Sequence, residues 1–256
     1  MTSGDDLRGG GRFSITAHDD PPRLVKRGDP AALAREARAL RAFSGTGIAP
    51  TLIASRPGEL TVGRLPGTPR ALDGQTPAQL RRLGATLRQL HDMRRQATGG
   101  RHVWPTSARS LQAYARRRLA DLTLPRELHA LAERIRAAFV PQPSQESHPF
   151  RLLHGDLVEQ NIIWSPGPVL VDWEFWRTGD PAEDLAYLVT VNDLTATTEA
   201  AILAGYADPA MRGRIAPWRA LCALDAGIWY EHEGRHDLAA NLVQRASTLA
   251  TTGERR

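Results

Sequence analysis

Two aspartates and one asparagine lie close together in the sequence, in a pattern that suits phosphoryl transfer. Asp156 and Asn161 are five positions apart in a segment expected to be a loop, and Asp172 follows shortly after. Residues 161–171 hold two short apolar runs around Ser-Pro-Gly-Pro, which predicts a hairpin that returns Asp172 to the side of Asn161. One aspartate can then accept the proton of an attacking hydroxyl, while the asparagine and the second aspartate supply oxygen ligands to Mg²⁺. The alternative is a solvated strand–loop–strand whose polar side chains only cap turns.

The chain before residue 67 is expected to contain strands around a single helix. Asp29 followed by Pro30 is typical of a helix start, because aspartate accepts from free amide groups and proline fits the first helical position. This helix is expected to end near Phe43. The predicted strands, separated by turn residues, cover residues 13–17, 23–27, 51–55 and 59–64.

The remainder of the chain is expected to be mainly helical, apart from the hairpin. Leucines recur at helical spacing after Thr76-Pro77, which predicts a helix with one apolar face. The chain as a whole is therefore expected to be α+β. Further helices are predicted around residues 107–122, 125–139, 182–192, 197–206, 214–233 and 235–250.

Three motifs in order resemble the aminoglycoside phosphotransferase family, a small-molecule branch of the kinase-like proteins. They are H-G-D-x-x-x-x-N, V-D-W-E and G-D-P-x-x-D-L-A, and they fall within residues 152–187. The resemblance implies a bilobal protein-kinase-like α+β fold, with a small β-rich N-terminal lobe (residues 1–66) and a larger, mainly helical C-terminal lobe (residues 67–256). It also implies that Asp156 is the catalytic aspartate, that Asn161 and Asp172 hold magnesium, and that ATP or GTP is the phosphate donor.

Lys26 and Glu36 match the lysine and glutamate that this family carries in its N-terminal lobe. Lys26 is the only lysine among 33 basic residues, and it lies on a predicted strand. Glu36 is three residues after Leu33 and four before Leu40, so it shares the inward stripe of the predicted helix. A carboxylate that faces the core needs a partner, and Lys26 is the natural one. The alternative is a surface lysine and a surface glutamate with no contact.

Other nucleotide contacts follow from the resemblance rather than from spacing. Gly10 and Gly11 belong to a glycine run just before the first strand, where a loop that covers phosphates is expected. The run is not G-x-G-x-x-G, and a glycine run near a chain end is also commonly just flexible. The backbone around Val62 and Arg64 would bind the adenine.

The acceptor is expected between the catalytic loop and the C-terminal helices. Acidic and aromatic side chains there would favour a cationic molecule through charge and cation–π attraction. An equally open reading is a core helix whose tryptophans pack inside and whose acids face water. The candidate acceptor residues are Glu159, Trp173, Glu174, Asp225 and Trp229.

Composition excludes several other classes of function. The net charge is +5, but the arginines are dispersed and alternate with alanine and leucine, which argues against a nucleic-acid function. No apolar run is long enough for a transmembrane helix, and the polar first residues argue against a signal peptide. The single cysteine, Cys222, is expected to be a buried thiol. The chain is therefore expected in the cytoplasm, as a monomer or homodimer.

The leading hypothesis is an ATP-dependent O-phosphotransferase that modifies a hydroxyl of a small, amine-bearing molecule. An antibiotic is the first choice, which would make the chain a resistance enzyme. A metabolite kinase for choline, thiamine or an amino-sugar is the alternative within the same class. A nucleotide-binding regulator without catalysis is a different class, and the presence of every expected catalytic group argues against it. A protein kinase is disfavoured because Asp-Trp-Glu replaces D-F-G.

Overall fold

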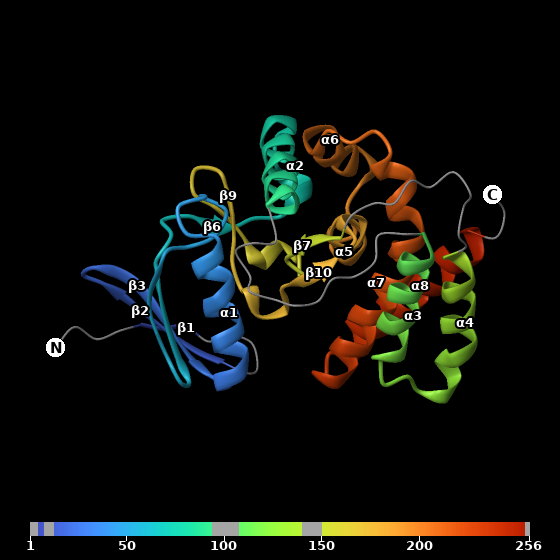
Figure 1. Ribbon diagram of the computed structural model, residues 1–256, viewed down its shortest axis with the longest axis horizontal. Coiled ribbons are helices and arrows are strands. Elements are labelled where there is room, and N and C mark those ends of the chain that lie inside the picture. The colour runs from blue at the N-terminus through green and yellow to red at the C-terminus, as the bar shows by residue number, and fades with distance from the viewer. Residues whose placement is uncertain (1–4, 8–12, 94–107, 140–149, 254–256) are drawn as a thin grey trace.

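The computed structural model describes residues 5–7, 13–93, 108–139 and 150–253. A small β-rich lobe and a larger, mainly helical lobe lie side by side along the long axis of the molecule (Figure 1). The predicted bilobal, kinase-like α+β fold is confirmed. Gly10 and Gly11 lie outside the described residues.

The N-terminal lobe is built on one five-stranded antiparallel sheet, ordered β1-β2-β3-β5-β4. Lys26 pairs with Ile15 on one side and with Leu60 on the other, so it lies on the central strand of the sheet. This position is rigid, because both edges of the strand are hydrogen-bonded. The strands are β1 (Asp5–Leu7), β2 (Phe13–Asp19), β3 (Pro22–Gly28), β4 (Leu52–Arg56) and β5 (Glu59–Gly63).

Helix α1 (Pro30–Ala42) packs against this sheet and faces the other lobe. The Asp29 side chain accepts from the amide of Ala32 at 2.7 Å and caps the helix start, as predicted. Leu33, Glu36 and Leu40 are all buried, which confirms the predicted inward stripe. The helix therefore carries one carboxylate into the interior among apolar side chains.

Two small sheets begin the larger lobe. One has the order β6-β8-β9, and β7 pairs with β10 in the other. The predicted boundary between residues 66 and 67 falls between β5 of the first lobe and β6 of the second. Gly67 lies there against Trp164, and a Cβ at this position would come within 1.9 Å of the Trp164 carbonyl oxygen, so only glycine fits. The strands are β6 (Thr68–Pro69), β7 (Arg151–Leu153), β8 (Ile162–Trp164), β9 (Pro168–Leu170) and β10 (Arg177–Gly179).

Helices form the rest of the larger lobe, close to the predicted ranges. α2 begins with a capping box between Thr76 and Gln79, in which each side chain accepts from the other residue's amide. The helices are α2 (Pro77–Asp92), α3 (Ala108–Ala120), α4 (His129–Ala138), α5 (Pro181–Val191), α6 (Ala196–Tyr206), α7 (Met211–His232) and α8 (His236–Gly253). Short 3₁₀ turns η1 (Leu72–Gly74), η3 (Arg126–Leu128), η4 (Glu159–Asn161) and η5 (Trp173–Phe175) join them.

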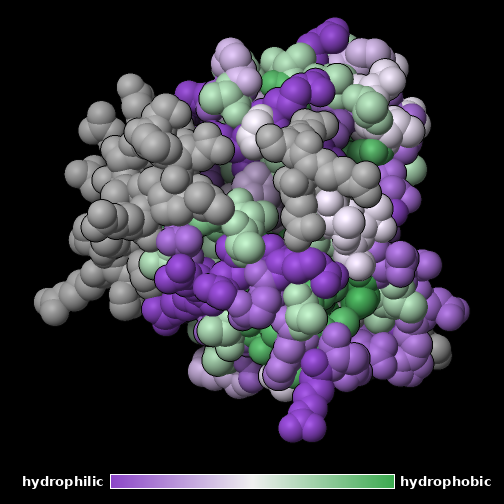
Figure 2. Space-filling view, turned by 90° about the vertical axis from the view of Figure 1, so that its right-hand side faces the viewer, coloured by the Kyte–Doolittle hydropathy of each residue, from purple (hydrophilic) through white to green (hydrophobic). Residues whose placement is uncertain are grey.

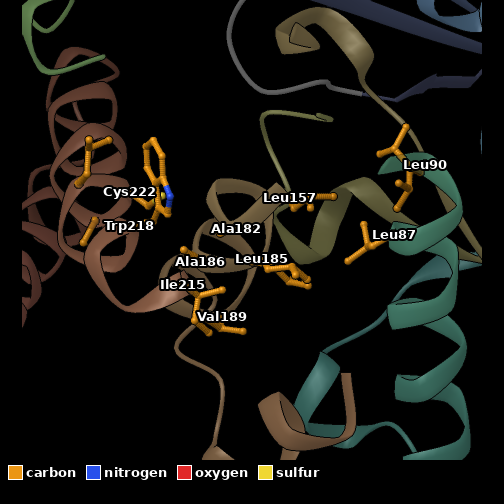
Figure 3. Close-up of a cluster of buried hydrophobic side chains, with 14 of the residues drawn as sticks. Leu87, Leu90, Leu157, Ala182, Leu185, Ala186, Val189, Ile215, Trp218 and Cys222 are labelled. Atoms are coloured by element: carbon orange, nitrogen blue, oxygen red, sulfur yellow. The ribbon is translucent and has the colours of Figure 1, made fainter. Parts of the chain in front are cut away.

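Helix α5 forms the centre of the core. Its side chains meet those of α2 on one side and those of α7 on the other (Figure 3). Nine of its eleven residues are buried, which is why its sequence is apolar around most of its circumference. Cys222 on α7 is 2% exposed, as predicted for a core thiol. The loop after β7, which carries Asp156, packs on this helix through Leu157, so it rests on the most buried of the described helices.

The differences from the predicted elements are confined to the shortest ones. Strands β1, β6, β7 and β10 have two or three residues each, too few to show a period in the sequence. None of the described helices is long and apolar enough to cross a membrane. Hydrophilic residues dominate the face of the molecule in Figure 2, and the hydrophobic ones outside the grey regions do not gather into one broad patch.

Candidate active site

The loop after β7 is held by backbone hydrogen bonds to one carboxylate of α5. Asp184 accepts from the amide of His154 at 2.7 Å and from the amide of Gly155 at 2.9 Å. Gly155 has φ of +86°, and a Cβ there would meet the carbonyl oxygen of Phe175 at 2.4 Å. The buried His154 ring lies 2.9 Å from the carbonyl oxygen of Val171 through Nε2. The loop that carries Asp156 is therefore fixed before any ligand binds.

Asp156 is held by donors on both carboxylate oxygens. The Asn161 amide donates to Oδ2 at 2.9 Å, and the Tyr187 hydroxyl donates to Oδ1 at 3.0 Å. Burial raises the pKa of Asp156, while His154 and the Tyr187 hydrogen bond act in the opposite direction. A raised pKa makes the carboxylate a better proton acceptor, which suits a group that takes a proton from a hydroxyl.

Asp172 follows β9 and stands beside Asn161, as the hairpin predicted. Its backbone is left-handed, with φ of 64° and ψ of 65°, and its side chain remains 37% exposed. The amide of Val171 donates to the carbonyl oxygen of Asn161 at 3.0 Å and joins the two positions. The strained backbone turns the carboxylate of Asp172 out of the strand direction.

The donor set of Asn161 and Asp172 fits a magnesium ion. The Asn161 nitrogen faces Asp156, so the amide oxygen is left for a cation, and Asp172 supplies a carboxylate. Mg²⁺ usually takes one or two protein oxygens and completes its shell with phosphate oxygens and water. Within the described residues no group of three His, Cys, Asp or Glu side chains could hold a metal alone. A metal bound to Asn161 and Asp172 would complete its coordination with phosphate oxygens or water.

Lys26 connects the two lobes through two carboxylates. Its Nζ lies 2.9 Å from Glu36 Oε2 and 2.6 Å from Asp172 Oδ1, and it stands 4.2 Å from the ring centre of Phe13. Burial lowers the pKa of Lys26, but Glu36 and Asp172 favour its charged form and raise the pKa overall. The lysine is therefore a fixed positive charge at the meeting point of the lobes.

A cavity of about 410 Å³ brings the catalytic loop and the C-terminal helices together. It adjoins both Asp156 and Asp172, so a ligand in it would meet the predicted catalytic groups. Its lining comes from the catalytic loop, η5, β10, α3, α5 and α7. The lining residues are Arg118, Gly155, Asp156, Val158, Gln160, Asn161, Asp172, Phe175, Arg177, Tyr187, Asp225, Ala226, Trp229, Tyr230 and Arg235.

Two of the five predicted acceptor residues line this cavity. Trp229 is 41% exposed, and its ring stands edge-on to Tyr230 with the ring centres 5.2 Å apart. Asp225 lies one turn earlier on α7, where one of its oxygens accepts from the guanidinium of Arg118. This part of the wall therefore carries aromatic side chains and one carboxylate, but Arg118, Arg177 and Arg235 line the same cavity and Asp225 already has a cationic neighbour.

The structure places the other three predicted acceptor residues outside the lining. Trp173 is fully buried between Phe43 and His154, and its indole nitrogen donates to the carbonyl oxygen of Leu170 at 2.8 Å. Glu159 accepts from the amide of Leu72 at 2.5 Å and so ties η4 to η1. Glu174 is 7% exposed.

Val62 and Arg64, the predicted adenine contacts, lie at the end of β5 and also outside the cavity lining. The Arg64 amide donates to the carbonyl oxygen of Pro22 at 3.2 Å, and its guanidinium stands 2.5 Å from Asp19. An adenine at this hinge would therefore meet a backbone amide that already has an intramolecular acceptor.

Several lining residues were not predicted from the sequence. Tyr187 could have been found from the sequence, because it lies one helical turn after Asp184, the residue expected to brace the loop, and so shares its helix face. Arg118 and Arg235 had no such signal, since each is one of many arginines in polar stretches. Arg177 and Tyr230 become recognisable only when β10 and α7 are placed against the loop.

Comparison with solved structures gives the same fold in proteins of different substrates. A choline/ethanolamine kinase family protein from Mesorhizobium loti is 22% identical, with a TM-score of 0.67, over 97% of this chain and 88% of that one. The macrolide 2'-phosphotransferase MphH from Brachybacterium faecium is 18% identical, with a TM-score of 0.67, over 95% and 91%. The aminoglycoside phosphotransferase APH(4)-Ia is 13% identical, with a TM-score of 0.72, over 98% and 94%.

A family model gives the stronger result. A search of the curated proteins found no significant match. The model of the phosphotransferase enzyme family, however, matches residues 12–218, which is most of the chain and includes Lys26, Glu36 and all three sequence motifs. The predicted resemblance and the predicted class of enzyme, a phosphotransferase with an alcohol group as acceptor, are confirmed. The chain belongs to the phosphotransferase enzyme family.

Proposed function

We propose that this protein transfers the γ-phosphate of ATP to a hydroxyl group of a small, amine-bearing molecule. The observation that carries the proposal is the convergence of Asp156, Asn161 and Asp172 on one cavity, with the Lys26–Glu36 pair joined to it through Asp172. Phosphoryl transfer depends mainly on positioning and on charge stabilisation, and these five groups supply both.

Each group has a role that follows from its chemistry. Asp156 is held by two neutral groups, the Tyr187 hydroxyl and the Asn161 amide, rather than by a cation. It can therefore accept the proton of the acceptor hydroxyl. Lys26, oriented by Glu36, presents a compact positive charge to the phosphates. Asn161 and Asp172 would hold magnesium, which when bound neutralises charge on the triphosphate.

The acceptor wall supports an amine-bearing substrate. Trp229 and Tyr230 line the cavity together with Asp225, and their two rings stand edge-on to each other. Only one Asp225 oxygen is engaged by Arg118, so the other can accept from an ammonium group. A cavity of about 410 Å³ suits a compact acceptor or one ring of a larger molecule. An amine-bearing antibiotic is our first candidate, which would make this a resistance enzyme.

A metabolite kinase is the second candidate, and the same wall favours it. An aromatic pair next to one carboxylate is also suited to a small amino alcohol or amino-sugar, for which a cavity of this size needs no extension. Similar folds occur both in a choline/ethanolamine kinase family protein and in antibiotic phosphotransferases, so the fold does not favour one candidate.

The deciding experiment measures magnesium-dependent phosphorylation of a defined panel. The purified protein is incubated with ATP or GTP and with amine-bearing antibiotics, choline, thiamine or glucosamine. The mass of each product is then measured by mass spectrometry to detect one added phosphate. We expect one class of acceptor to stimulate nucleotide consumption and to gain that mass. Asp156→Asn should lower turnover by about 10³-fold while nucleotide affinity stays within about threefold.

Asp121→Asn is the matched control. Asp121 is an exposed carboxylate at the end of α3, outside the cavity lining, and its loss should leave turnover within about twofold. Full turnover by Asp156→Asn would contradict the catalytic role. Nucleotide binding with no phosphorylated product from any member of the panel would favour the non-catalytic regulator.

A further inference from the structure

The catalytic carboxylate has a second support that no sequence motif indicated. Asn161 belongs to the same loop as Asp156, but Tyr187 reaches it from α5, and its hydroxyl donates to Oδ1 at 3.0 Å. A carboxylate free to rotate about its last torsion would present its oxygens in many directions. Donors on both oxygens, from two different elements, leave one orientation for the carboxylate plane.

The placement of Tyr187 on α5 makes this support rigid. Asp184, one turn earlier on the same face, holds the backbone of the loop through His154 and Gly155. One helix thus fixes the loop backbone with Asp184 and the reacting side chain with Tyr187. Because α5 is the most buried helix of the lobe, both contacts are anchored in the core.

The hydroxyl also lies where the acceptor must come. Tyr187 lines the same cavity as Asp156, and it is half-buried rather than sealed in the core. Burial, followed by the charge of Asp156, raises the pKa of Tyr187 well above its usual range, so the phenol stays a donor. Each oxygen of an ionised carboxylate has room for a further hydrogen bond, so Oδ1 can still receive the acceptor hydroxyl.

We propose that Tyr187 is a positioning residue that fixes the carboxylate of Asp156 for attack by the acceptor hydroxyl. This inference rests on the proposed function, because it gives Asp156 the catalytic role. It assigns to Tyr187 an effect on turnover rather than on nucleotide binding, since the proposed function gives the nucleotide to Lys26 and to magnesium held by Asn161 and Asp172. A small misplacement of a reacting group costs up to about 100-fold in rate.

The test uses magnesium-ATP with water as the acceptor, so the natural acceptor need not be known. Steady-state hydrolysis is measured for the wild type, Tyr187→Phe, Asp156→Ala and the double variant. Tyr187→Phe should lower kcat by about 10- to 100-fold and change KM for ATP by no more than about twofold. In the Asp156→Ala background, Tyr187→Phe should lower kcat by less than about twofold. Once the carboxylate is missing, Tyr187 has nothing to position.

Tyr206→Phe is the matched control for loss of a buried phenol. Tyr206 lies on α6 outside the cavity lining and stands 3.0 Å from His91 Nδ1 through its hydroxyl. It should lose a similar hydrogen bond and keep at least half of the hydrolysis rate. This control separates loss of a hydroxyl in general from loss of the one on Asp156.

The outcomes distinguish the inference from the function on which it rests. Loss of hydrolysis in Asp156→Ala with a normal rate in Tyr187→Phe would overturn the role of Tyr187 and keep that of Asp156. Additive losses in the double variant would also overturn it, because Tyr187 would then act independently. A wild type that neither hydrolyses ATP faster than Asp156→Ala nor phosphorylates any acceptor of the panel would overturn the proposed function, and the inference with it.

Discussion

Two ion-pair networks of opposite design adjoin the cavity, at what we propose are its nucleotide end and its acceptor end. At the nucleotide end, one ammonium group meets two carboxylates: Lys26 lies between Glu36 and Asp172. The group carries more negative than positive charge, and Asp172 remains partly exposed. A net negative charge next to a cavity is suited to a divalent cation, which would balance it when bound.

At the acceptor end, two guanidinium groups meet two carboxylates. Arg118 and Arg177 both donate to Glu183, at 2.9 Å and 2.7 Å, and Arg118 also pairs with Asp225. Tyr114 adds a hydrogen bond of 2.6 Å to Glu183. This network is balanced, and it joins α3, β10, α5 and α7. Its chemistry is that of a buried clamp, in which planar guanidinium groups satisfy several oxygens at fixed angles.

The contrast shows how charge balance separates a ligand site from a scaffold. In the balanced network the carboxylate of Glu183 is almost fully buried between two guanidinium groups. The unbalanced network has a partly exposed carboxylate, that of Asp172, and a single cation, Lys26. Carboxyl pKa values follow the same division. In the unbalanced network burial raises the pKa of Glu36 despite Lys26, whereas in the balanced one burial of Glu183 is outweighed by Arg177 and Arg118, which lower its pKa.

Among changes to the two networks, the largest effect is expected from Lys26→Arg. The charge is kept, but Nζ sits in a buried space between two carboxylates, and a planar guanidinium directs its donors differently. We expect kcat/KM for ATP to fall by about 10²- to 10³-fold, measured by steady-state kinetics. Arg27→Lys is the control, since Arg27 is the neighbouring residue, is half-exposed and pairs with Glu59. Equal activity of the two variants would mean that any cation serves at position 26.

Removing a cation from the balanced network should lower the free energy of unfolding more than it lowers the rate of nucleotide consumption. Arg118→Met leaves Asp225 without its guanidinium partner and Glu183 with one fewer. We expect the free energy of unfolding to fall by about 2–3 kcal/mol in urea titrations. Arg116→Met, an exposed position on the same helix, should change it by less than about 0.5 kcal/mol. Equal values for the two variants would show that the clamp contributes nothing to folding.

Acid should weaken the same network. The folded pKa of Glu183 is below its usual value, and that of Asp184 is lowered too: burial opposes the change, but His91 outweighs it. A depressed pKa gives stability that is complete above the unfolded pKa and is lost as pH falls through the folded pKa. The gap in unfolding free energy between wild type and Glu183→Gln should therefore be constant from about pH 5.5 to 7. Below about pH 4.5 it should narrow by up to about 1.4 kcal/mol per pH unit. A gap that widened in acid would contradict this sign.

The two regions also differ in how far the sequence predicted them. Phosphoryl transfer requires fixed groups at fixed spacing, so Asp156, Asn161 and Asp172 could be found as a motif and placed together by one hairpin. Predicting Lys26 and Glu36 required only one strand and the apolar face of one helix, and both patterns were clear in the sequence. These residues depend on local structure that the chain encodes within a few positions.

The acceptor end depends on contacts between distant helices, which no local pattern encodes. Trp173 was predicted at the acceptor site from its place beside Asp172, but packing against Phe43 holds it in the core. Arg118 could not be distinguished from its neighbours Arg116 and Arg117 without α7 beside it. In a run of three arginines, the sequence does not indicate which side chain faces a neighbouring helix or which carboxylate it will pair with.

The smallest effect is expected from Trp229→Ala, because Trp229 is 41% exposed and contributes mainly a ring face to the cavity. Cation–π attraction at an exposed site is worth about 0.5–1 kcal/mol, so KM for an amine-bearing acceptor should rise by about two- to fivefold with kcat little changed. Ile53→Ala, which removes an exposed apolar side chain from β4, should change neither value. The comparison is sharpened by testing an acceptor whose amine is replaced by a hydroxyl. An equal loss for that neutral acceptor would assign Trp229 to shape rather than charge, and would leave Asp225 as the remaining candidate for recognition of the amine.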